Sequence, residues 1–237
     1  MKILAIDSSG LVATVAVVEN EELLAEYTTN YKKTHSQTLL PMLEHVKEMI
    51  DLDLNTVDYL AVAAGPGSFT GLRIGSATVK GLGLALQKPV VEVPTLEGLA
   101  YNMCGTNHLV CPLMDARRNQ VYTGIYGFEA IEQSWQMVTV KEQCAVDISE
   151  IIEACNALDK SVIFLGDGVP VYATKISELC KVPYTFAPAG MNRQRAATIA
   201  VLAAKYAKEG KVVSAAEHAP EYLRKSQAER EREEANG

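Results

Sequence analysis

The sequence predicts an α/β protein with two domains and a mixed sheet. A chain of 237 residues, of which 48% are hydrophobic, can bury two modest cores. Its first part reads as three strands joined by short turns, followed by helix, strand and helix. Short turns make the first three strands an antiparallel meander, whereas helical crossovers join parallel strands. This order predicts a mixed sheet and differs from the repeated βαβ units of a Rossmann fold.

The elements of the first half are predicted from their apolar patterns. Apolar and β-branched runs predict strands at residues 2–7, 11–20, 22–30, 59–67 and 90–93. Apolar residues recur at helical spacing over 34–50 and again over 69–86, which predicts two helices. Thr34 and Ser36 are N-cap candidates for the first helix.

The second half alternates more evenly between strands and helices. Its predicted strands cover residues 109–114, 121–128, 135–140 and 162–166. Its predicted helices cover residues 149–158, 170–180 and 193–210. The segment after Pro220 has almost no apolar residues, which predicts a charged, flexible tail over 223–237.

Composition excludes several classes of protein. The formal net charge of −7 argues against a broad basic surface that grips a nucleic-acid backbone. No apolar run reaches about 18 residues and no leader begins the chain, so we expect a cytoplasmic protein without a membrane span. The five cysteines lack any C-x-x-C pair and are expected to be reduced core residues, and the four histidines have no metal-ligand spacing. We therefore predict no metal and no cofactor.

The glycine-rich run AAGPGSFTGLRIG, residues 63–75, raises the question of a phosphate cradle. A P-loop would end in Gly-Lys-Ser/Thr, which is absent here. A dinucleotide fingerprint would place a third glycine at Thr70, and Pro66 removes one N–H donor. The glycines are better explained by a tight strand-to-helix turn with close backbone approach.

The helix predicted over 69–86 is apolar around most of its circumference. A polar stripe contains Arg73, Ser76 and Lys80. One apolar face consists of Leu72, Gly75, Val79, Leu82 and Leu86. The other consists of Ile74, Ala77, Gly81, Leu84 and Ala85. Such a helix must be covered on two sides, one by its own sheet and the other by a second chain or by the second domain.

Several segments along the chain resemble one bacterial family. The segments are ILAIDSSGLVATVAVV, AAGPGSFTGLRIGSATVKGLGLA, VPTLEGLA, MDARRNQVYTGIY, FLGDGV and APEYLRK. Together they resemble the TsaB family, also called YeaZ, which takes part in the synthesis of threonylcarbamoyladenosine on tRNA. The resemblance implies an actin/Hsp70-like (ASKHA, ribonuclease H-like) fold with two domains, each with a mixed sheet flanked by helices. It implies a first domain of residues 1–103 plus 192–222, to which the last helix returns, and a second of residues 104–191.

The resemblance also implies partners. It implies a heterodimer with the homologous catalytic subunit TsaD through a bundle of two helices from each protein, association with the ATPase TsaE, and tRNA contact only through the complex. A homodimer is expected when TsaD is absent. The predicted partner surface consists of Leu39, Met42, Leu43, Val46, Leu72, Gly75, Val79, Leu82 and Leu86.

Catalysis by this chain itself is not expected. TsaD relatives carry a His-x-x-x-His metal pair, and the resemblance aligns Thr95 and Leu99 with those histidines. The turn after residue 114 has bulky, charged residues where actin-like enzymes need a glycine-rich phosphate turn. We therefore predict a non-catalytic subunit of the tRNA threonylcarbamoyladenosine synthesis complex. The alternative is an independent nucleotide hydrolase of the actin-like type or a peptidase.

A few residues stay open between two interpretations. Asp7 and Ser8 are weak candidates for a vestigial cofactor site, or Asp7 caps its own turn together with Ser8 and Ser9. Ser68 is a nucleophile candidate or the N-cap of the helix that follows it. Arg117 and Arg118 bind an anion or form surface ion pairs.

Overall fold

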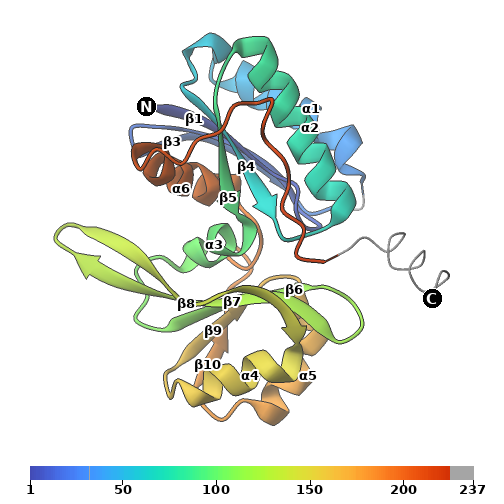
Figure 1. Ribbon diagram of the computed structural model, residues 1–237, viewed down its shortest axis with the longest axis vertical. Coiled ribbons are helices and arrows are strands. Elements are labelled where there is room, and N and C mark those ends of the chain that lie inside the picture. Colours follow the sequence, from blue (N-terminus) through green and yellow to red (C-terminus); the bar gives the residue numbers. More distant parts are fainter. Residues whose placement is uncertain (32, 225–237) are drawn as a thin grey trace.

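The computed structural model describes residues 1–31 and 33–224, and within them the chain forms two five-stranded sheets, one above the other in Figure 1. The strand orders are β3-β2-β1-β4-β5 and β10-β9-β6-β7-β8. If the second order is read from β8 to β10, it matches the first order. In each sheet, the three strands of a meander lie beside two strands that are reached through crossovers. The predicted α/β class is confirmed, and the repeated order agrees with the ribonuclease H-like fold that the resemblance implies. Among the described residues, no helix is long and apolar enough to cross a membrane.

The first sheet is mixed, as the turn lengths predict. Its strands are β1 Lys2–Asp7, β2 Ala13–Glu19, β3 Glu22–Thr29, β4 Tyr59–Gly65 and β5 Val90–Pro94. β1, β2 and β3 pair antiparallel, whereas β4 runs parallel to both β1 and β5. Because β1 lies in the centre and is buried on both faces, its sequence KILAID is almost entirely apolar.

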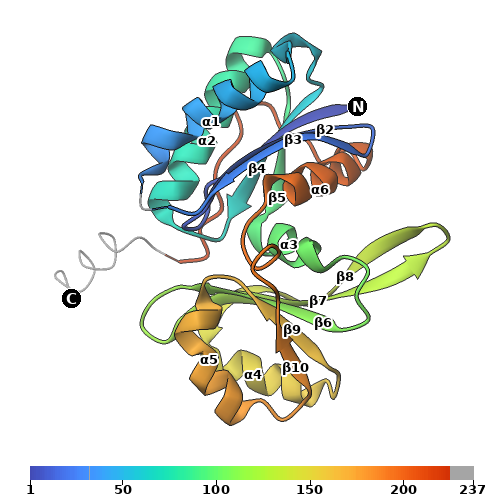
Figure 2. The ribbon, with the colours of Figure 1, turned by 180° about the vertical axis from the view of Figure 1, so that it is seen from behind.

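Helices cover both faces of this sheet (Figures 1 and 2). α1 His35–Met49 and α2 Phe69–Leu86 pack side by side on one face, and α6 Ala196–Lys208 packs on the other. α6 lies about a hundred residues beyond β5, so the chain visits the second sheet before it returns to complete the first. The 3-10 turn Leu54–Thr56 joins α1 to β4.

The second sheet is built in the same way. Its strands are β6 Leu109–Asp115, β7 Gln120–Ile131, β8 Ser134–Asp147, β9 Val162–Leu165 and β10 Tyr184–Phe186. Its helices are α4 Ile148–Ala157 and α5 Gly168–Leu179 on one face, with the short α3 Thr95–Ala100 and the 3-10 turn Tyr101–Met103 on the other. α3 therefore lies between the two sheets, which Figure 1 shows at the centre of the molecule.

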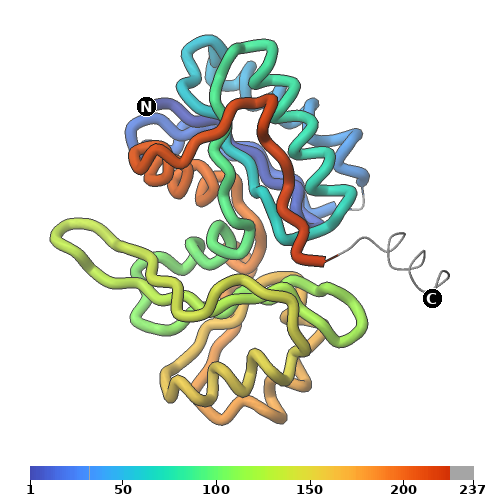
Figure 3. The backbone as a smooth tube through the Cα atoms, viewed as in Figure 1, coloured from blue at the N-terminus to red at the C-terminus, as the bar shows by residue number. Residues whose placement is uncertain are grey.

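The last described residues form a strap along the first sheet. This C-terminal strap, residues 213–224, begins with a two-way backbone pairing between Val213 and Val90, with both N–O distances 2.9 Å. It follows α2 toward the second sheet (Figure 3), where Arg224 Nη1 donates to the Ala116 carbonyl at 2.8 Å. The tail predicted from residue 223 onward thus begins within the strap, and from residue 225 it lies outside the described residues.

Candidate functional site

A cleft of about 1020 Å³ separates the two sheets. From the first sheet it is lined by Ser9, Gly10, Lys33, His35, Ser68 and Thr70, among others. From the second it is lined by Asp115, Arg117, Tyr122 and Asp167, among others. The glycine-rich run and the turn after residue 114 therefore both line this cleft.

Asp7 ends β1 beneath the cleft and is turned inward. Its Oδ1 accepts hydrogen bonds from Ser9 N at 2.8 Å and from Ser9 Oγ at 2.6 Å. Burial raises the pKa of Asp7 to about 6, against the opposing effect of these two hydrogen bonds. The turn-capping interpretation of Asp7 is thus confirmed for Ser9. Ser8 instead donates its hydroxyl to the Gly71 carbonyl at 2.9 Å, so both candidate residues have partners inside the chain.

The glycines of residues 63–75 allow the turn after β1 to lie against the start of α2. A Cβ added at Gly71 would be 2.0 Å from the Ser8 carbonyl oxygen, and one at Gly67 would be 2.3 Å from that of Ser9. Any larger residue would push the two segments apart. The prediction of close backbone approach is confirmed.

Ser68 is the N-cap of α2. Its side-chain oxygen accepts from Gly71 N at 3.3 Å, while its own N–H donates to the Ser9 carbonyl at 2.7 Å. Two N–H groups that a phosphate cradle would use are therefore engaged within the chain. The N-cap interpretation of Ser68 is confirmed.

The opposite wall of the cleft holds two carboxylates. Asp115 N donates to Asp167 Oδ1 at 3.2 Å, and burial raises the pKa of Asp167. Tyr172 donates its hydroxyl to Asp115 Oδ1 at 3.2 Å, and its own pKa is raised to about 12, chiefly by burial. The Arg117 side chain is 87% exposed and forms an ion pair with Asp115 at 3.7 Å. For Arg117 this is the surface ion pair, the second of the two interpretations that the sequence allowed.

The turn between these groups differs from a phosphate loop. Arg117, Arg118 and Asn119 all adopt left-handed backbone with φ between 57° and 65°. Larger side chains in this conformation carry a steric cost that glycine avoids. A turn selected to cradle phosphate with its backbone would carry glycine at these positions.

The positions aligned with the metal-binding histidines are part of the core. Thr95 Oγ1 accepts from Gly65 N at 3.1 Å, and Leu99 is 1% exposed. Over residues 1–31 and 33–224, no group of three or more His, Cys, Asp or Glu side chains is arranged to hold a metal ion. All five cysteines are free thiols, and Cys104 is exposed instead of buried as predicted.

Most residues of the predicted partner surface lie inside the chain. Seven of its nine residues are buried against the chain's own sheet: Leu39, Met42, Leu43, Val46, Leu72, Gly75 and Val79. The remaining two, Leu82 and Leu86, are half-buried. The reason is that α2 has two apolar faces of similar composition, and the face chosen from the sequence is the one that packs on β4.

The other apolar face of α2 is open. Ala77, Gly81 and Ala85 are exposed on it, and Leu84 is 59% exposed. On the neighbouring α1, Leu40 is 56% exposed and Met49 is 69% exposed. Because α1 and α2 lie side by side on one face of the sheet (Figure 1), their outer sides form a single surface, which we call the α1/α2 face.

One buried group of polar side chains was not predicted from the sequence. His218 of the strap is 2% exposed, with Nε2 at 2.8 Å from Ser76 Oγ and Nδ1 at 2.6 Å from Glu92 Oε1. The order Ser, His, Glu resembles that of a hydrolase triad. However, Ser76 lies in the middle of α2, is 7% exposed and does not line the cleft. The group therefore fixes the strap and offers no accessible nucleophile.

Comparisons with known proteins agree with this architecture. The family model described as TsaD, tRNA N6-adenosine threonylcarbamoyltransferase, matches residues 22–232. The tRNA threonylcarbamoyladenosine biosynthesis protein TsaB of Bacillus subtilis (strain 168) is 32% identical over 231 residues, which are 97% of this chain and 96% of that protein. TsaB of Escherichia coli (strain K12) is 34% identical over 128 residues, 53% of this chain and 55% of that protein.

Two solved structures from Pseudomonas aeruginosa are similar along nearly their whole length. YeaZ superposes with a TM-score of 0.74 at 27% identity, covering 94% of this chain and 99% of that one. A structure described as an uncharacterized protein with similarity to peptidase YEAZ has a TM-score of 0.76 at the same identity and coverage. The extent of these matches shows that the chain belongs to the TsaB (YeaZ) family of tRNA threonylcarbamoyladenosine biosynthesis proteins, which is related to TsaD.

Proposed function

We propose that this chain is a non-catalytic subunit that binds a TsaD protein through the α1/α2 face and so supports threonylcarbamoyladenosine synthesis on tRNA. The observation that carries the proposal is the open outer face of α2. There the uncharged residues Ala77, Gly81 and Leu84 are exposed to solvent. Exposed apolar helices on a globular domain mark interaction sites. Small residues among them allow a partner helix to approach closely.

The family match supports the identity of the partner. The chain matches the TsaD model over most of its length, so a TsaD protein would present a related helix pair. Two related helix pairs can join as a four-helix bundle around a pseudo-twofold axis. In this proposal TsaE joins the pair, and the assembled complex binds tRNA in the cytoplasm. Because this chain has a net negative charge, we do not expect it to bind RNA alone.

Residues of the chain support a role without catalysis. Thr95 and Leu99 replace the histidines expected from TsaD relatives and serve the core. Asp7 and Ser8 are engaged by Ser9 and Gly71. All four side chains are therefore used to hold the fold.

The test is Ala77→Glu, assayed by co-purification with TsaD of the same organism. A carboxylate in the centre of a helix-to-helix contact must be desolvated without a partner, so we expect binding to be lost while the fold is kept. Ala157→Glu, at another exposed alanine that lies at the end of α4 in the second sheet's layer, is the matched control and should bind normally. Unchanged binding of the Ala77→Glu protein would contradict the proposal.

The alternative of an independent hydrolase rests on the size of the cleft, about 1020 Å³, which is large enough for a nucleotide. Calorimetry of the isolated chain with ATP and magnesium decides between the two. We expect no micromolar binding because the Arg117–Asn119 turn does not present a glycine backbone to phosphate. Binding followed by hydrolysis would favour the alternative. Labelling by a fluorophosphonate probe would do the same for a peptidase.

A further inference from the structure

The C-terminal strap runs antiparallel along one side of α2. Its Ala215 lies against Gly83, where an added Cβ would be 2.7 Å from the Ala215 Cβ. Further on, Lys80 Nζ donates to the His218 carbonyl at 3.1 Å. Figures 1 and 3 show the strap beside α2. Its contacts involve the polar stripe of α2, through Arg73, Ser76 and Lys80, whereas Ala77, Gly81 and Leu84 stay exposed.

His218 fixes the middle of the strap. It joins Ser76 on α2 to Glu92 on β5 through its two ring nitrogens, at 2.8 Å and 2.6 Å. Two partners from separate elements leave the ring a single orientation. The backbone N–H of Ala219 also points at Glu92 Oε1, at 3.3 Å.

Beyond His218 the strap forms an aromatic stack at the start of α2. The rings of Tyr222 and Phe69 lie parallel, with an interplanar angle of 3° and centroids 4.3 Å apart. Arg73 lies beside them, with Cζ 5.8 Å from the Phe69 centroid and Nε donating to the Tyr222 hydroxyl at 3.4 Å. These two contacts, a hydrogen bond from Nε and a cation–π contact, hold the Arg73 side chain.

Arg73 is exposed, and no ion pair to it is formed within residues 1–31 and 33–224. It lies one helical turn before Ala77, at the edge of the α1/α2 face. Its terminal Nη groups form the fork that binds a carboxylate with two parallel hydrogen bonds. An arginine held in place at the rim of an apolar face is an anchor for an anionic partner group.

We propose that Arg73, positioned by Phe69 and by Tyr222 of the strap, binds a carboxylate on the protein that docks on the α1/α2 face. The proposal rests on the proposed function and adds the chemistry of the partner, a helix with an Asp or Glu side chain at its rim. Arg73 makes the contact, whereas Tyr222 and His218 are positioning residues. The strap thereby becomes part of the binding surface.

The first experiment measures the dissociation constant for TsaD of the same organism at several salt concentrations. Arg73→Ala should weaken binding by roughly tenfold or more and flatten its salt dependence. Arg73→Lys keeps the charge but lacks the fork, so it should recover part of the affinity and retain the salt dependence. Arg118→Ala, another exposed arginine, is the control and should bind normally.

The second experiment tests the strap. Tyr222→Ala should weaken binding several-fold because Arg73 then has more conformations to lose on binding. Measured in the same assay, His218→Ala should weaken binding and also increase amide hydrogen exchange over residues 213–224. A Tyr222→Ala protein with full affinity would show that the strap does not position Arg73.

The outcomes separate this inference from the proposed function. If Ala77→Glu abolishes binding and Arg73→Ala leaves it unchanged, the α1/α2 face is the interface and the arginine anchor is wrong. If neither substitution changes binding, both the proposed function and the arginine anchor are wrong. Loss of affinity in Arg73→Ala without any change in salt dependence would contradict pairing with a charged group.

Discussion

At the scale of single residues, Asp7 is a buried carboxylate that caps the turn after β1. It is buried, and the hydrogen bonds from Ser9 only partly offset the cost of removing its charge from water. The carboxylate therefore binds a proton more tightly in the folded chain than in the unfolded chain. This difference makes folding stability depend on pH.

We predict that Asp7→Asn stabilises the protein above pH 6. The pKa of Asp7 is raised from 3.8 to about 6, so between these values the folded state holds a proton that the unfolded state has lost. Stability of the natural chain thus falls as pH rises through this window and levels above it. The side-chain oxygen of the asparagine still accepts hydrogen bonds from Ser9. The gain in the free energy of unfolding over the natural chain approaches about 3 kcal/mol at neutral pH. Urea unfolding at several pH values measures it.

Asp53→Asn is the control for that series. Hydrogen bonds from Asn55 lower the pKa of Asp53, so its carboxylate contributes stability that is lost as pH falls. The two variants should therefore change the pH dependence in opposite directions. A pH-independent difference between the Asp7→Asn protein and the natural chain would show that Asp7 has an ordinary pKa.

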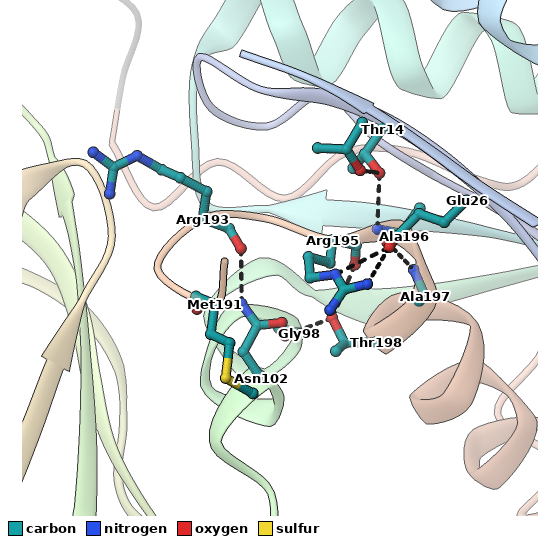
Figure 4. A network of polar contacts seen from close by, with 11 residues as sticks. Thr14, Glu26, Gly98, Asn102, Met191, Arg193, Arg195, Ala196, Ala197 and Thr198 are labelled. Atoms are coloured by element: carbon teal, nitrogen blue, oxygen red, sulfur yellow. Dashed lines mark hydrogen bonds and ion pairs between the residues drawn. The ribbon is translucent and has the colours of Figure 1, made fainter. Parts of the chain in front are cut away.

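At the scale of elements, the start of α6 depends on a carboxylate from the edge strand β3. Glu26 Oε1 accepts from Ala197 N at 3.1 Å, and its Oε2 accepts from Arg195 Nε at 3.0 Å and from Nη2 (Figure 4). Thr14 Oγ1 accepts from Ala196 N at 3.2 Å. An acidic group at a helix N-terminus satisfies free N–H groups and interacts favourably with the helix dipole.

We predict that Glu26→Ala lowers the free energy of unfolding by about 2 kcal/mol. The substitution removes a cap from α6 and leaves Arg195, only 36% exposed, without its carboxylate. Glu26→Gln should lose less, since the amide oxygen still accepts one bond. Equilibrium urea unfolding measures both, and Glu22→Ala, exposed on the same strand, is the control. Equal stabilities of the two alanine variants would rule out the capping role.

Long elements were predicted well because their periodicity is local. The apolar spacing of residues 69–86 gives the bounds of α2 directly, whereas β10 has three residues and α3 has six, too few for a period to emerge. The hairpin of β7 and β8 is longer than predicted, chiefly because β8 continues over residues 141–147, where Lys141, Glu142 and Gln143 interrupt the apolar run.

The site was harder to predict than the fold. Nothing local tells which apolar face of α2 meets the sheet, and Leu72 and Val79, which the sequence assigned to the partner surface, are buried within the chain. The polar stripe of Arg73, Ser76 and Lys80 was visible, but its partner is the strap, and Ser76 and His218 are 142 residues apart in the chain. Only the tertiary fold brings such a pair together.

At the scale of the whole molecule, several contacts among the described residues join the layers of the two sheets. The returning chain passes Asn102, whose Nδ2 donates to the Met191 and Arg193 carbonyls at 2.9 and 2.7 Å (Figure 4). The β7–β8 hairpin reaches α6, where Lys205 Nζ donates to the Trp135 carbonyl at 3.0 Å. The strap ends on Ala116. With the halves joined on several sides, the α1/α2 face is presented on a firm scaffold.

That open face leads to a prediction for the chain without its partner. A contiguous apolar surface on a globular protein favours association, and one patch that meets its own copy around a twofold axis forms a closed dimer. We expect the purified chain to form a homodimer whose fraction rises with protein concentration. Leu84→Glu should keep the chain monomeric, because two carboxylates would then face each other across the contact. Sedimentation velocity over a range of concentrations measures this, with Ala157→Glu as the control that should dimerise normally. A Leu84→Glu protein that sediments as the natural chain does would place self-association on another surface.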